Sequence, residues 1–173
     1  TCNSIYLRQI MQQYAAGKSD DLAYRLARRN AHNADAALST TLANMLMEPG
    51  HFRKEADVGF RFLVLSHTLL SYLSGLGAHR ETQLPAEVRE HLIEGAGNTL
   101  AASIDEIATG LANKQPIAIQ SDAEEALAVE LEQMPDEIDE GQRLVQTQLA
   151  LICRQLGPLR TLAAHLIKDT RAA

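Results

Sequence analysis

Polar side chains that could do chemistry concentrate in residues 25–44, within a segment that otherwise reads as one long alanine-rich helix. At about 100° per residue, these polar side chains fall into two groups on different sides of the helix. The first group is Arg25, Arg28, His32, Asp35 and Ser39. It has the pattern of a solvated helix face, on which arginines and aspartates pair at helical spacing. The functional alternative is an anion-binding patch or interface made by Arg25, Arg28, Arg29 and His32.

The second group places amides and hydroxyls on the same side as leucines and alanines. Its members are Leu22, Leu26, Asn30, Asn33, Ala37, Thr40, Thr41 and Asn44. Buried amides and hydroxyls need hydrogen-bond partners, and small side chains let a neighbouring helix come close. We therefore expect a tight seam between helices that contains Asn30, Asn33, Thr41 and Asn44. The alternatives are contact with a second subunit or with a small polar ligand.

Neither metal binding nor nucleophilic catalysis has support in the sequence. Di-iron bundles need Glu-x-x-His steps on two helices, whereas the one such step here, from Glu48 to His51, is interrupted by a proline and a glycine. The chain has no GxSxG, glycine-rich phosphate loop or HExxH motif. Cys2 and Cys153 lie in unrelated contexts, which indicates neither a zinc site nor a disulfide framework. We expect no cofactor and no enzymatic activity.

Length and composition favour a single α-helical domain. A chain of 173 residues can bury one core, and no flexible linker divides it. Aromatic residues make up only 4%, while alanine and straight-chain residues that favour helices are abundant. The formal net charge of -6, with 16 Lys plus Arg, argues against a general nucleic-acid binder. We expect one all-α domain over residues 1–173.

Start and stop signals divide the chain into helices. Asp20 is the expected cap of the second helix, and Glu48-Pro49-Gly50 is its expected end. Gly157-Pro158 is expected to separate the last two helices. The expected helices span about residues 3–16, 21–47, 55–78, 85–112, 122–133, 138–156 and 159–166. These lengths predict an antiparallel bundle of long helices with one or two short additional helices.

The stretch Phe62–Ala78 is uncharged apart from His67 and approaches the roughly 20 apolar residues of a membrane helix. Its serines, its threonine and its histidine favour a buried bundle helix, and its apolar residues lie nearly all round. We expect this helix in the middle of the bundle. The N-terminal residues lack the order of a secretory signal and read as a chain entered in mid-helix.

Two stretches, DDLAYRLARRNAHNADAALSTTLANMLMEPG and GFRFLVLSHTLLSYLSGLGAHRE, resemble the C-terminal soluble region of the YccS/YhfK family of bacterial inner-membrane proteins. This family lies within the fusaric-acid-resistance-like (FUSC) group of exporters, and the resemblance runs from about Tyr6 to Glu81. It implies a longer chain with membrane helix bundles, of which these residues are the last cytoplasmic portion. It also implies export of aromatic carboxylic acids by the whole protein. It brings no catalytic or substrate-binding residues to these positions.

The resulting prediction is a non-enzymatic cytoplasmic helical domain that serves assembly or regulation of a bacterial inner-membrane exporter. Its expected partners are the membrane-spanning part of the same protein and a second copy of the chain. The alternative is a ligand-sensing module, in which Arg28, Arg29 or His32 receives an organic anion such as an aromatic carboxylate.

Overall fold

The computed structural model describes residues 1–16, 22–47 and 53–172, and every secondary-structure element in these ranges is helical. The elements are α1 (Cys2–Ala16), α2 (Leu22–Met47), α3 (Arg53–Ala78), α4 (Ala86–Arg89), η1 (Glu90–Ala96), α5 (Gly97–Asn113), α6 (Asp122–Glu132) and α7 (Glu140–Ala172). One short π-helix, η1, lies between α4 and α5. The predicted all-α fold is confirmed. The expected cap at Asp20 and stop at Glu48-Pro49-Gly50 lie outside the described residues.

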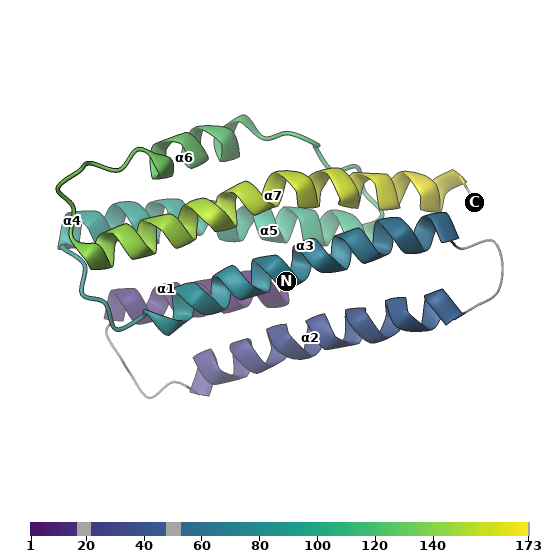
Figure 1. The fold of residues 1–173 in the computed structure, drawn as a ribbon, viewed down its shortest axis with the longest axis horizontal. Helices are drawn as coiled ribbons and strands as arrows, with labels where there is room; N and C mark the ends of the chain where they lie inside the picture. The colour runs from purple at the N-terminus through teal and green to yellow at the C-terminus, as the bar shows by residue number, and fades with distance from the viewer. Residues whose placement is uncertain (17–21, 48–52, 173) are drawn as a thin grey trace.

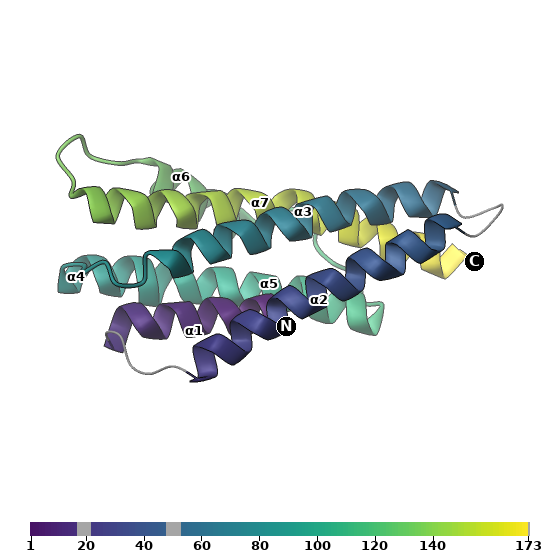
Figure 2. The same cartoon turned by 60° about the horizontal axis from the view of Figure 1, so that its bottom comes forward.

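Four helices form a ring around the core. The helix α1 packs on α3 and α5, and α7 packs on the same two helices from the other side. Figures 1 and 2 show these helices side by side along one axis, with α2 outside α1 and α3 and with α6 outside α7. Successive long helices run antiparallel, whereas α5 and α7 run parallel because α6 returns the chain between them. The arrangement confirms a bundle of long helices with short additional ones.

Apolar residues at three- and four-residue steps line the inside of this ring. Each fully buried leucine or isoleucine contributes about 1.5–3 kcal/mol through the hydrophobic effect. Side chains with no exposed surface come from α1, α3, α5 and α7, and they include Leu7, Ile10, Leu73, Leu76, Leu100, Leu149, Ile152 and Leu156. The core therefore lies between the four ring helices, and α2 and α6 cover it from outside.

The helix α3 is buried along its second half and partly exposed along its first half. Leu69, Leu73 and Leu76 are buried, whereas Phe60 is 50% exposed and Val64 is 48% exposed. The expectation of a buried bundle helix is confirmed for the second half. The expected position in the middle is wrong for the first half, because the helix there packs on α2 and α7 and leaves an outer side uncovered by any described residue. No helix within residues 1–16, 22–47 and 53–172 is long and apolar enough to cross a membrane.

The helix α7 continues through Pro158, so the predicted break at Gly157-Pro158 is wrong. A proline in a helix removes one backbone donor and disfavours helical geometry in the preceding residue through a clash with its Cβ. The preceding residue here is Gly157, which has no Cβ. Leu156 and Leu159 on either side are both buried, and their packing stabilises one continuous helix.

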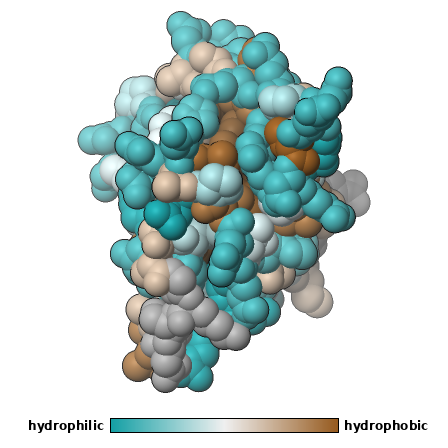
Figure 3. Space-filling model, turned by 90° about the vertical axis from the view of Figure 1, so that its left-hand side faces the viewer, coloured by the Kyte–Doolittle hydropathy of each residue, from teal (hydrophilic) through white to brown (hydrophobic). Residues whose placement is uncertain are grey.

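The π-helix lies at the start of the fourth long element, where Gly95 and Gly97 weaken the helix. Gly97 is also a point of close approach, because a Cβ there would lie 2.4 Å from Met11 Sδ on α1. Seen from the end where η1 and α4 lie, the surface is mostly hydrophilic, with a few apolar side chains between polar ones (Figure 3). Gly97 therefore lets α5 pack closely against α1 directly after the π-helix.

Candidate functional site

The helix α2 touches the rest of the bundle through one narrow stripe. Among the α2 side chains that the structure describes, the buried ones are Tyr24, Ala27, Ala31 and Leu42. Three of these four residues recur at steps of three and four, so they share one side of the helix. Contact through this stripe leaves most of the α2 surface exposed. The positions of the residues that could do chemistry are therefore given relative to this stripe.

The predicted seam of Asn30, Asn33, Thr41 and Asn44 is wrong within this chain, because all four residues are exposed. At about 100° per residue they lie roughly 80–160° around the helix from Ala31. The Thr41 hydroxyl needs no partner helix, since it donates to the Ala37 carbonyl over 2.9 Å. We call the exposed surface that these residues share the outer face of α2. It consists of Leu22, Leu26, Asn30, Asn33, Ala37, Thr40, Thr41 and Asn44.

The outer face also carries large apolar side chains. Leu22 is 71% exposed and Leu26 is 43% exposed, and Met47 at the end of α2 is 84% exposed. Their exposure contrasts with the small side chains that α2 buries, such as Ala27 and Ala31. Some of the large apolar side chains of α2 therefore point away from the bundle.

The predicted anion patch lies on a different side of α2 from the outer face. Arg25, Arg28, Arg29 and His32 are all exposed. His32 lies beside α3, with its Nε2 3.5 Å from Ser74 Oγ. At about 100° per residue, the four residues spread over about 100° of the helix surface, so they share one broad side of α2.

Three buried tyrosines form a polar cluster between α1, α2 and α3. Tyr14 Oη donates to the Leu76 carbonyl over 2.7 Å, and the rings of Tyr6 and Tyr24 lie 5.8 Å apart. The guanidinium of Arg80 lies 4.7 Å from the Tyr24 ring centre, a distance typical of a cation–π contact. Burial raises the pKa of Tyr6 and of Tyr14 well above the usual tyrosine value. Both hydroxyls therefore stay protonated at neutral pH.

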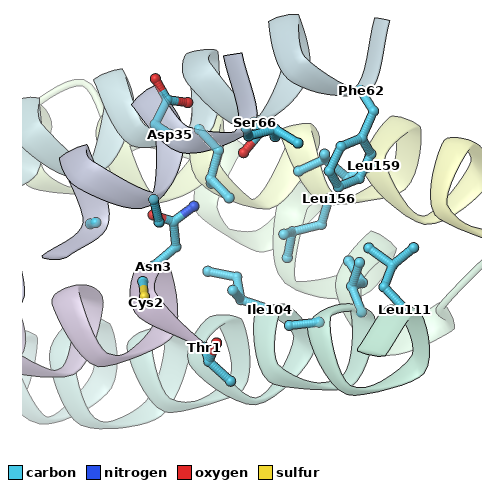
Figure 4. Close-up of a pocket in the computed structure, with 16 residues that line it drawn as sticks. Thr1, Cys2, Asn3, Asp35, Phe62, Ser66, Ile104, Leu111, Leu156 and Leu159 are labelled. Carbon is cyan, nitrogen blue, oxygen red and sulfur yellow. The ribbon is translucent and has the colours of Figure 1, made fainter. Parts of the chain in front are cut away.

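An apolar groove lies beside the start of α1. Its volume is about 220 Å³, and Figure 4 shows Phe62, Leu156, Leu159 and Leu111 at one end and Thr1, Cys2 and Asn3 at the other. Its walls come from α2, α3, α5 and α7. The α2 wall is made by Ala31, Ala34, Asp35 and Leu38, and the α5 wall by Ile104, Ile107, Ala108 and Leu111.

A hydrogen bond between two side chains lies at the rim of the groove. His67 Nδ1 on α3 is 2.8 Å from Asp35 Oδ2 on α2, and the side chain of Asp35 is only 16% exposed. The other carboxylate oxygen, Oδ1, is buried and has no hydrogen-bond partner among the described residues. The groove thus has one carboxylate at its edge and apolar walls inside, an arrangement that favours an apolar occupant over an anion.

A buried arginine joins three helices on the other side of the bundle. Arg160 on α7 is 1% exposed. Its Nε and Nη2 donate to Glu124 on α6 over 2.6–3.0 Å, and Nη2 donates to Glu106 on α5 over 2.8 Å. Sequence reasoning missed this cluster. The available signal was the position of Arg160 within the apolar stripe of α7, next to Leu159 and Ala163.

The described residues offer no metal site and no activated thiol. No group of three or more His, Cys, Asp or Glu among them could hold a metal ion. Cys153 is buried, and its Sγ lies 3.2 Å from the Glu124 carbonyl. Burial and the neighbouring Glu124 raise the pKa of Cys153 to about 11, so its thiol stays protonated and is a weak nucleophile. Cys2, at the groove, is only partly buried.

Comparison with known proteins gives matches to half of the chain or less. The inner membrane protein YccS of Escherichia coli is 46% identical over 86 residues, which are 50% of this chain and 12% of that protein. An uncharacterized protein of Haemophilus influenzae is 53% identical over 79 residues, 46% of this chain and 11% of that protein. An uncharacterized protein of Neisseria gonorrhoeae, ORF2, is 37% identical over 78 residues, 44% of this chain and 19% of that protein.

The chain is thus a homologue of an inner-membrane protein over half of its length. No protein-family profile matches it, and no solved structure matches it. The aligned part spans about an eighth of YccS. The similarity therefore indicates a domain of a membrane protein.

Proposed function

We propose that residues 1–173 form a non-enzymatic helical domain on the cytoplasmic side of a bacterial inner-membrane exporter of the YccS/YhfK family, FUSC group. In this proposal the domain serves assembly or regulation of the exporter. The observation that carries the proposal is the 46% identity to the inner membrane protein YccS over half of the chain. The substrates, in this proposal, are aromatic carboxylic acids that the membrane-spanning part of the same protein transports.

The outer face of α2 is the surface best suited to contact with the rest of such a protein. Protein interfaces combine exposed apolar side chains with polar groups that can hydrogen-bond across the contact. The outer face offers Leu22 and Leu26 beside the amides of Asn30 and Asn33. Because these side chains are exposed and lie outside the core, a change there should affect assembly with little loss of core packing.

Export by the whole protein tests this proposal. Cells that lack the parent protein receive the full-length chain, a chain without residues 1–173, or the full-length chain with Leu26→Asp. Survival in aromatic carboxylates is measured together with the amount of protein in the membrane. We expect both altered proteins to insert normally and to lose export.

The matched control is Ala36→Asp, another exposed position on α2 that lies off the outer face. It should leave export unchanged. Full export by the chain without residues 1–173 would show that the domain serves neither assembly nor regulation. Equal export by Leu26→Asp and Ala36→Asp would remove the outer face from the proposal.

A second candidate function is sensing of an organic anion. It is favoured by the exposure of Arg25, Arg28, Arg29 and His32 within two turns of α2, since guanidinium groups bind carboxylates strongly. Binding would stabilise the folded state by mass action. An increase in melting temperature with benzoate that disappears in Arg28→Ala/Arg29→Ala would support it. No increase at millimolar benzoate would remove it.

A further inference from the structure

The ring of four helices is complete along only part of its length. The helix α1 takes the position between α3 and α5 from Cys2 to Ala16, whereas α2, α3 and α7 extend beyond its first residue (Figure 1). The groove occupies this position in the remaining part of the ring. Its walls come from α2 and from the inward sides of α3, α5 and α7, the other three helices of the ring.

The groove is lined by core residues of the ring that are at most 6% exposed, and by the half-buried apolar side chains of Leu38, Phe62 and Leu111. Ile104 and Ile107 of α5 line it, as do Leu156 and Leu159 of α7. Its volume of about 220 Å³ exceeds that of an engineered apolar cavity that binds benzene, about 150 Å³. Hydrophobic surface of this kind marks a place where another apolar element binds.

We propose that a helical segment of the longer protein, running on in line with α1 before Thr1, fills this groove and completes the ring. The inference rests on the proposed function insofar as residues 1–173 are part of a longer chain. The relatives supply that length, because the aligned regions are only 11% and 12% of the first two. The segment belongs to this chain because the groove opens directly at the first turn of α1.

The geometry of α1 permits this extension. The Thr1 carbonyl accepts a hydrogen bond from the Ile5 amide over 2.9 Å, so Thr1 already takes part in the helical pattern. From Ile104 to Leu111 the α5 wall spans seven steps, or about 10 Å at 1.5 Å per residue. About two further helical turns of α1 would cover this wall.

The chemistry of the segment follows from the groove walls. The core-facing positions of α1 include Ser4, Leu7 and Ile10. Continued backward at helical spacing, this stripe passes through the residues about one, four and five positions before Thr1. These residues should be apolar. Asp35 at the rim disfavours a second carboxylate there, because two like charges in a partly buried place repel each other.

Thiol accessibility in the full-length protein tests this inference. In a Cys2→Ser background, Ala34→Cys places a thiol on the α2 wall of the groove. Ala36→Cys is the matched control, because it is an exposed alanine of the same helix outside the groove. Modification at each position is measured by mass spectrometry of the labelled peptide in membrane vesicles. We expect the thiol of Ala34→Cys to react at least about tenfold more slowly than that of Ala36→Cys, since a covered thiol reacts only after local opening.

Crosslinking then identifies the occupant. A second cysteine is placed four residues before Thr1, and oxidation should join it to Ala34→Cys within one chain. Equal labelling of Ala34→Cys and Ala36→Cys would overturn the inference, because the groove would be open. A crosslink between two chains would also overturn it in favour of a second copy. Slow labelling of Ala34→Cys without any crosslink would also overturn the inference, because a different occupant would then cover the groove.

A second pair of variants guards against misfolding. If Ala34→Cys protein does not accumulate, Ala108→Cys probes the opposite wall on α5, and the exposed Ala112→Cys is its control. These measurements require no export activity. An open groove in a full-length protein whose export depends on residues 1–173 would refute the inference but not the proposed function. A covered groove in a protein that exports equally well without residues 1–173 would refute the proposed function but not the inference.

Discussion

His67 on α3 donates a hydrogen bond from Nδ1 to Asp35 Oδ2 on α2 over 2.8 Å, at the rim of the apolar groove. This bond ties α2 to α3 through a carboxylate that is mostly withdrawn from water. The other oxygen of Asp35 has no partner in the described part of the chain. The pair therefore holds the α2 wall of the groove in place with only half of the carboxylate satisfied.

His67→Ala should destabilise the protein by about 1 kcal/mol, because it leaves a partly buried carboxylate without its partner. The exposure of His67 keeps this effect modest. Asp35→Leu/His67→Ala should recover the loss, since it removes the carboxylate and adds apolar surface at the groove. Urea unfolding of the two variants measures both changes. A double variant less stable than His67→Ala would contradict this account.

Arg160 should be the most sensitive single side chain outside the apolar core. Arg160→Ala leaves Glu124 buried without its partner, and breaking a buried ion pair in this way costs about 3–5 kcal/mol. The matched control is Arg154→Ala on the same helix. Arg154 also binds two carboxylates, Glu125 and Glu132, but its side chain is 41% exposed, so its loss should destabilise the protein far less than the loss of Arg160. Chemical unfolding should separate the two variants clearly.

The same cluster should make the stability depend on pH. The hydrogen bond and charge of Arg160 hold the pKa of Glu106 below its ordinary value despite partial desolvation. A carboxyl whose pKa is lower in the folded state stabilises the fold above its unfolded pKa, and this stabilisation is lost as pH falls through the folded pKa. We expect the melting temperature to decrease as the pH drops below about 4.3, the usual pKa of glutamate. Glu106→Gln should flatten that fall, and an unchanged profile would exclude Glu106 as a contributor.

The sequence predicted the helices better than it predicted the faces of α2. Apolar spacing located the long helices, including α6, whose N-cap Ser121 accepts a hydrogen bond at Oγ from the Glu124 amide. In α2, however, alanine occurs on nearly every side, so hydropathy does not define which side is buried. The buried side of α2 is instead the side that carries the bulky Tyr24 and Leu42, and neither residue belonged to the predicted seam.

Pro158 and Arg160 were missed for a related reason. Proline usually ends a helix, and arginine is usually absent from the buried side of a helix. Each is tolerated here because of its immediate surroundings. Gly157 removes the clash before Pro158, and carboxylates from α5 and α6 neutralise Arg160. The groove could not be predicted from the sequence either, since its walls come from four helices far apart in the chain.

The tyrosine cluster gives a prediction about glycine. A Cβ at Gly77 would lie 2.7 Å from Tyr24 Oη and 3.3 Å from Tyr6 Oη. Gly77→Ala should therefore force these rings apart and cost about 1–3 kcal/mol through overpacking. Gly95→Ala is the control. The nearest atom to its Cβ is the Glu90 carbonyl oxygen at 3.7 Å, so the added methyl should be neutral or stabilise the helix by up to about 1 kcal/mol.

Thermal unfolding distinguishes the two glycine variants, and tyrosine fluorescence reports on the cluster itself. Gly77→Ala should change the emission, because Tyr6, Tyr14 and Tyr24 are three of the four tyrosines in the chain. Gly95→Ala should leave it unchanged. If Gly77→Ala were as stable as the parent protein and had the same emission, the close packing of α2 against α3 at Tyr24 would be refuted, and with it the stripe that sets the outer face of α2.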